Sequence, residues 1–124
     1  AGRNDGAAYL AGYVAECSLK ALLLHEKGTP SVGTPHPWKK GRDGHELATL
    51  QSDAATIAFV AGAKTARYFG PTVKGLTSLA LAAWDPEMRY RAPSMAAADA
   101  TSWLANAEAV YHETVGTMIK DGVL

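Results

Sequence analysis

Apolar residues recur at helical spacing through most of the chain, and no segment alternates apolar and polar residues for long. From about Asn4 to Lys27 they recur every three or four positions, which predicts a helix packed along one face. Asn4 or Asp5 is suited to cap its first turn, and Gly28 and Pro30 end it. The spacing assigns to the core a stripe of Leu10, Val14, Cys17, Ala21 and Leu24.

Shorter helices are predicted in the middle of the chain. One begins near His45 and runs to Gly62, and a related segment continues to the break at Gly70 and Pro71. Another covers about 72–83 and is followed by a turn at 84–87.

The last predicted helix has Ser94 as its N-cap and ends at Gly122. Its apolar stripe is Ala100, Trp103 or Leu104, Ala107, Val110 or Tyr111, and Met118. Since β-branched residues are sparse and alanine is abundant, the pattern predicts an all-α fold, an up-and-down helical bundle forming a single domain over residues 1–124.

Residues 28–44 form a long basic loop between the first two predicted helices. The segment holds four of the 12 glycines and three of the 6 prolines, which excludes a regular element. Trp38 lies beside Lys39, Lys40 and Arg42, so one aromatic face accompanies three cations. Such a cluster is suited to stack a base and neutralise phosphates, and the alternative is a solvated loop with Trp38 folded onto the bundle.

Composition narrows the classes of function. The 124 residues are 48% hydrophobic, too apolar for a disordered tail, and 12 basic residues balance 12 acidic ones, so a polyanion site must be a local patch. Cys17 is the only cysteine, which excludes an internal disulfide and a cysteine-rich zinc cluster. No uninterrupted apolar run reaches the length of a membrane span, and we expect a cytoplasmic protein without a membrane partner.

Two polar features on the predicted helices are candidates for chemistry. Glu16 and Lys20 are four residues apart, in the favoured order for a helical ion pair, on an otherwise apolar helix. They form either a structural polar pair or part of a site within the bundle. His45, near Arg42 at a helix start, is the histidine best placed for function, although a capping or packing role there is also open. The histidine spacings match no metal-ligand motif, so neither a metal nor another cofactor is expected.

Three short segments, in this order, give the chain a resemblance to the HEPN family. They are GYVAECSLKALL at 12–23, Gly44-His45-Glu46-Leu47 at a helix start, and Trp84 followed by Arg89-Tyr90 before the last helix. HEPN domains are small helical bundles found in prokaryotic toxin-antitoxin, nucleotidyltransferase-partner and RNA-processing systems. The resemblance implies a homodimer or a complex with a nucleotidyltransferase-like partner. It also points to a preceding helix that this chain lacks.

The chain departs from the motif of the nuclease members of that family. Those members carry an arginine and a histidine four to six residues apart near the start of the last helix. The corresponding positions after Arg89 are Ser94, Met95 and Ala96, and after Arg91 they are alanines. Metal-independent RNase activity would therefore need a different pair, His45 with Arg42 or Arg89.

The expected function is that of a non-catalytic HEPN-like module that binds nucleotide, RNA or a nucleotidyltransferase-type partner as a dimer. Two alternatives stay open: a diverged metal-independent RNase, and a purely structural dimerisation module. The expected dimer anchors are Tyr9, Tyr13, Trp103 and Tyr111, because aromatic residues are enriched at interfaces. The expected nucleotide or RNA surface consists of Lys39, Lys40, Arg42, Arg89, Tyr90 and Arg91.

Overall fold

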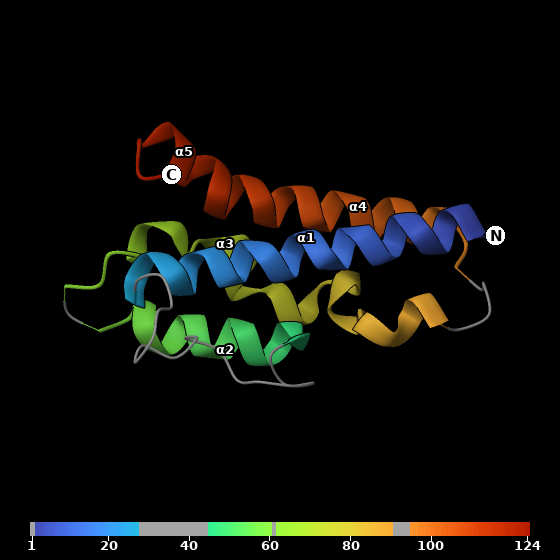
Figure 1. Ribbon diagram of the computed structural model, residues 1–124, viewed down its shortest axis with the longest axis horizontal. Coiled ribbons are helices and arrows are strands. Elements are labelled where there is room, and N and C mark those ends of the chain that lie inside the picture. The colour runs from blue at the N-terminus through green and yellow to red at the C-terminus, as the bar shows by residue number, and fades with distance from the viewer. Residues whose placement is uncertain (1, 28–44, 61, 91–94) are drawn as a thin grey trace, which may run out of the picture.

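The computed structural model describes residues 2–27, 45–60, 62–90 and 95–124, and these residues form an all-α bundle without a strand (Figure 1). The long helix α1 (Gly2–Lys27) runs alongside α4 (Ala97–Tyr111) with the same chain direction. A π-helical segment, His112–Gly116, joins α4 to the short helix α5 (Thr117–Lys120). Helix α2 (Leu47–Ala58) packs against α1 from another side. The predicted all-α bundle is thus confirmed.

The buried face of α1 differs from the predicted one. Leu10 is 60% exposed, and Val14 and Cys17 are exposed as well, so the stripe predicted from them does not face the core. Because α1 is apolar on two faces, spacing alone does not select the buried one. Alanine on the true core face allows neighbouring helices to approach closely. The residues of α1 that enter the core are Ala8, Ala11, Ala15, Leu19, Leu22 and Leu23.

The first turn of α1 is also used differently from the prediction. The helix begins at Gly2, so Asn4 and Asp5 lie inside it and neither acts as its N-cap. Asp5 instead accepts a hydrogen bond through Oδ1 from the backbone amide of Met95 at 3.0 Å. This bond fastens the chain just before α4 to the start of α1.

The segment between α2 and α4 is built from short turns instead of the predicted continuous helices. Helix α2 ends at Ala58, and Gly62 has a positive φ of 79°, which favours glycine. Helix α3 (Pro71–Lys74) is a single turn, and its neighbours at Ala66–Tyr68, Leu76–Ser78, Ala80–Ala83 and Pro86–Tyr90 are 3₁₀ turns. Extended backbone at Leu79 interrupts the helical path, and the turns on either side bury Leu76 and Leu81. Tertiary packing here overrides local helical spacing.

The last helix matches its predicted core face. Ala100, Trp103, Ala107, Val110 and Met118 are buried, while Leu104 and Tyr111, the alternatives at two positions, are exposed. Its N-cap is Ala96, and the predicted cap Ser94 lies outside the described residues.

Glu113, within the π-helical segment, joins the end of the last helix to the middle of the chain. Its two carboxylate oxygens accept hydrogen bonds from the backbone amides of Thr72 at 2.9 Å and Val73 at 2.7 Å. A carboxylate at the first amides of a helix is electrostatically favourable. Glu113 therefore caps α3 from a distant part of the chain.

Candidate functional site

Glu16 accepts two hydrogen bonds on one carboxylate oxygen, one from within α1 and one from the residues just before α2. Lys20 Nζ donates to Glu16 Oε2 at 2.7 Å, and His45 Nδ1 lies 3.0 Å from the same oxygen. Glu16 is only 3% exposed, whereas the side chain of His45 is 48% exposed. The predicted Glu16 and Lys20 pair is confirmed as an ion pair, and the structure adds His45 to it.

The chemistry of the carboxylate determines the state of the imidazole. An ionised carboxylate accepts hydrogen bonds and donates none, so Nδ1 of His45 must carry the proton of their shared bond. Nε2 is then either a lone-pair nitrogen in the neutral ring or a second donor in the imidazolium. A buried carboxylate behind a partly exposed histidine is an arrangement suited to proton transfer or nucleophilic attack.

The other two histidines in the described part of the chain lack such support. His112 Nε2 lies 3.4 Å from Glu108, but both side chains are exposed and belong to neighbouring turns of one helical stretch. His25 packs edge-on against Tyr68, with 5.9 Å between ring centroids. His45 is therefore the histidine whose ring is held by a buried charge.

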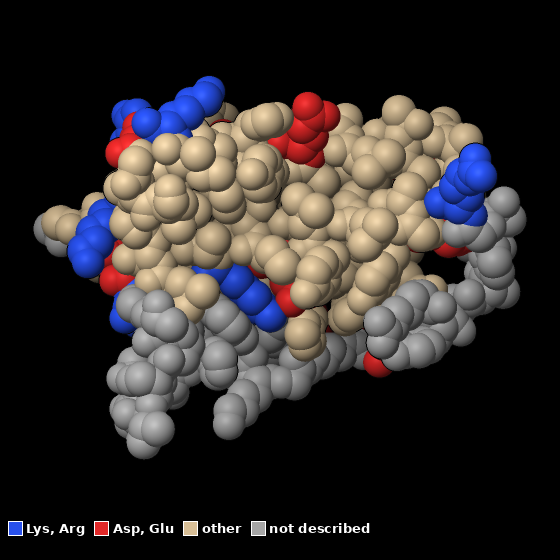
Figure 2. Space-filling view, turned by 45° about the horizontal axis from the view of Figure 1, so that its top comes forward, with Lys and Arg blue, Asp and Glu red and all other residues tan. Residues whose placement is uncertain are grey.

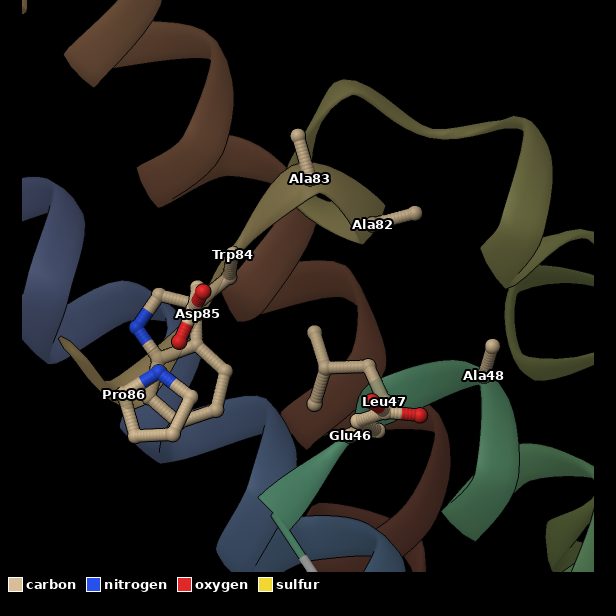
Figure 3. A pocket seen from close by; sticks show the side chains of 8 residues that line it. All are labelled: Glu46, Leu47, Ala48, Ala82, Ala83, Trp84, Asp85 and Pro86. Carbon is tan, nitrogen blue, oxygen red and sulfur yellow. The ribbon is translucent and has the colours of Figure 1, made fainter. Parts of the chain in front are cut away.

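A cavity of about 290 Å³ lies beside the start of α2 (Figure 3). Its walls come from the residues that follow His45 and from the chain around Trp84, which the figure shows facing each other across the hollow. Glu46 accepts a hydrogen bond from Thr49, and Asp85 accepts one from the amide of Glu87. With these carboxylates in its lining, the cavity is poorly suited to phosphate. Its lining residues are Glu46, Leu47, Ala48, Ala82, Ala83, Trp84, Asp85 and Pro86.

A second surface of interest is a nearly uncharged face along α1 and α4, here called the α1/α4 face. Figure 2, which turns α4 toward the viewer, shows a broad area of uncharged side chains with charged ones mainly at its ends. The exposed residues of α1 on this face are Leu10, Tyr13, Val14 and Cys17. On α4 the exposed large residues are Leu104 and Tyr111.

The α1/α4 face has a hollow of about 420 Å³ between its two helices. Leu10 and Val14 border it from α1, and Leu104 and Tyr111 border it from α4. Glu108 is the only acidic residue in its lining, which is otherwise apolar or aromatic. The pKa of the Tyr13 phenol on α1 is raised, first by the charge of Cys17 and then by a hydrogen bond with the Cys17 side chain.

Most of the predicted cationic surface falls where the structure gives no description. Lys39, Lys40, Arg42 and Arg91 lie outside the described residues. Arg89 and Tyr90 end the 3₁₀ turn Pro86–Tyr90, whose backbone packs against α1. The expected nucleotide or RNA surface therefore stays a prediction. Within the described residues, no group of three or more His, Cys, Asp or Glu side chains converges as metal ligands would.

Two of the four predicted dimer anchors are used inside the fold. Trp103 is buried in the core, and Tyr9 packs against the core beside Trp84. Tyr13 and Tyr111 are exposed on the α1/α4 face as an interface would require. The contact between Glu16 and His45 was missed by sequence reasoning, because it joins residues 29 positions apart.

No protein-family model, curated protein or solved structure matches this chain. Helix α1 from Arg3 to Lys27 is long and apolar enough to cross a membrane by length and mean hydropathy, and half of its most apolar stretch is buried inside the fold. The core helix of a soluble protein passes the same test. The physical properties of the two surfaces therefore carry the functional argument.

Proposed function

We propose that this chain is a non-catalytic HEPN-like binding module that works as a homodimer joined through the α1/α4 face. The observation that supports the proposal is the exposure of Leu10, Leu104 and Tyr111 around an apolar hollow on that face. Contiguous apolar surface of this kind is uncommon on proteins that stay monomeric, and it marks interaction sites.

The α1/α4 face is large enough for a stable interface. Helix α1 is about 39 Å long, and the helical stretch 97–120 about 36 Å, at 1.5 Å per residue. Two adjacent helices of this length have a footprint of about 700 Å² over their full length, close to the roughly 800 Å² that each partner contributes to a standard interface. The exposed apolar residues at 10–17 and 104–111 occupy the middle part of that footprint. The scarcity of charge also agrees with homodimer interfaces, which are more apolar than other contact surfaces.

A second copy is the partner that the shape of the face favours. A two-fold symmetric interface uses the same patch on both subunits, so the patch must contain both the protruding and the receiving parts. Leu10 and Leu104 protrude beside a hollow that they help to form. A leucine of one copy can therefore fill the hollow of the other, and the burial of both copies' apolar side chains drives association.

The binding partner of the dimer is proposed from the sequence. Nucleotide or RNA would be bound through its phosphates and bases by Lys39, Lys40, Arg42, Arg89, Tyr90 and Arg91. The alternative partner of the dimer is a nucleotidyltransferase-type protein. Phosphate contacts by lysine and arginine weaken steeply with salt. The proposed setting is the cytoplasm.

Light scattering of the purified protein across micromolar concentrations tests the dimer. We expect the wild type to have the mass of two chains and Leu104→Glu to have the mass of one, because the substitution places a charge in the apolar hollow. Ser52→Glu, at an exposed position of α2, is the matched control and should leave the dimer intact. A wild-type monomer over the whole range would overturn the proposal.

The hydrogen bond between Glu16 and His45 favours a second candidate, a diverged metal-independent RNase. An oriented imidazole is the general base that cleavage through a 2′-hydroxyl needs, and losing it typically costs about 10²- to 10⁴-fold in rate. An assay that measures both the retention and the cleavage of labelled single-stranded RNA by the protein distinguishes the two candidates. Cutting that is lost in both His45→Ala and Arg89→Ala would favour the nuclease. Salt-sensitive retention of the RNA without cleavage would favour the binding module. If the protein neither retains nor cleaves the RNA, the structural dimerisation module is the remaining candidate.

A further inference from the structure

The imidazole of His45 is held at Nδ1, and its side chain is partly exposed to solvent. Nδ1 donates its proton to the buried carboxylate of Glu16 at 3.0 Å. In the neutral ring Nε2 therefore keeps its lone pair, and nearly half of the side chain is in contact with solvent. A nucleophile that is oriented from behind by a second group and exposed in front is prepared for attack on an electrophile.

One feature of the surroundings favours an anionic electrophile. The ammonium of Lys20 bonds the same carboxylate oxygen as His45, so a fixed positive charge lies next to the ring. The start of α2 adds no anion site of its own, because its N-cap residue Glu46 places a carboxylate over the first turn, where it accepts a hydrogen bond from Thr49.

We propose that His45 is a phosphoryl-acceptor site, with Nε2 as the nucleophile and Glu16 as its positioning residue. The Nε2 lone pair forms a bond to the phosphorus of a small phosphoryl donor, and the bond from phosphorus to the leaving group breaks. With phosphoramidate as donor, ammonia departs with the bonding electron pair. The Nδ1 proton stays on its bond to Glu16, whose charge balances the positive charge that the ring acquires. This modification goes beyond association and RNA binding and requires neither.

The test is phosphorylation of the purified full chain by phosphoramidate at neutral pH. Intact mass and peptide mapping give the rate at each histidine, and phosphorus NMR distinguishes the Nε2 product from the Nδ1 product. We expect His45 to react about 10- to 100-fold faster than His112 or His25, by analogy with the effect that an orienting partner has on metal-binding histidines. The control His112→Ala should leave the rate at His45 unchanged.

Glu16→Gln tests the positioning role. Its amide nitrogen can donate to Nδ1, which releases the ring from the reactive tautomer, so the rate at His45 should fall to that of His112. If circular dichroism shows that this variant is unfolded, the double variant Glu16→Leu, Lys20→Met removes both charges together and should show the same loss. Equal rates at all histidines, phosphorylation at Nδ1, or an unchanged rate in the folded Glu16 variant would each overturn the proposal.

Discussion

The indole ring of Trp84 lies against the α-carbon of Gly12 and fills the space that a side chain at position 12 would need. The ring is held there by a hydrogen bond from its Nε1 to the carbonyl oxygen of Tyr9 at 3.1 Å, and the two aromatic rings pack at 6.0 Å between centroids. Trp84 is also a wall of the cavity beside α2. A residue without a side chain on α1 thus positions the surroundings of the candidate site.

Gly12→Ala should therefore destabilise the protein although alanine favours helix. The added methyl group would displace Trp84, and overpacking of this kind costs about 1 to 3 kcal/mol in the free energy of unfolding. Gly6→Ala is the matched control, because nothing lies within 4 Å of its added carbon and alanine there should be neutral or stabilising by up to about 1 kcal/mol. Urea denaturation at one fixed protein concentration measures both, and equal effects would contradict the packing described for Trp84.

Glu16 and Lys20 should behave as a coupled pair in stability measurements. Lys20→Met leaves the buried carboxylate without its strongest partner and should cost about 1 to 3 kcal/mol in the free energy of unfolding. The double variant Glu16→Leu, Lys20→Met should cost less than Glu16→Leu and Lys20→Met added together. Additivity within about 0.5 kcal/mol would show instead that the two charges act independently.

The location of this pair shows what sequence could and could not predict. The spacing of Glu16 and Lys20 within one helix predicted their ion pair, because helical geometry is local. The approach of His45 depends on how the chain returns from α1 to α2, and local periodicity contains no such information. The same distinction applies to α1 itself. Its length and helical state were predictable, whereas the choice between its two apolar faces was made by the elements that pack against it, chiefly α4 and α2.

Replacement of Glu113 should weaken the link between the last helix and α3. Glu113→Ala removes both acceptors of the Thr72 and Val73 amides and should cost about 1 to 3 kcal/mol, the range for leaving buried or partly buried donors unpaired. Amide hydrogen exchange should become faster at Thr72 and Val73 in this variant. Unchanged protection of those amides would show that the cap contributes little.

The contact between Arg67 and Asp121 predicts a specific loss of stability in acid. Hydrogen bonds from Arg67 and then from the Tyr68 hydroxyl hold the pKa of Asp121 below its usual value. Because the folded-state pKa is the lower one, the contact contributes stability above about pH 4, and the contribution is lost as pH falls through the folded-state pKa. Thermal unfolding from pH 7 down to pH 2 should show the wild type and Asp121→Asn converging. A difference that stays constant with pH would rule out this contribution.

The π-helical segment His112–Gly116 has a consequence for insertions and deletions in this chain. Each hydrogen-bonded turn of a π-helix contains one residue more than a turn of α-helix, so the last helix accommodates a supernumerary residue there without breaking. Deleting Val115 would allow a regular α-helix to form through this region. Glu113, or the residues beyond it, would then be rotated about the helix axis by about 100°. The segment is thus the point in the bundle where a change in length is absorbed by rotation, and the cap on α3 and the burial of Met118 depend on its extra residue.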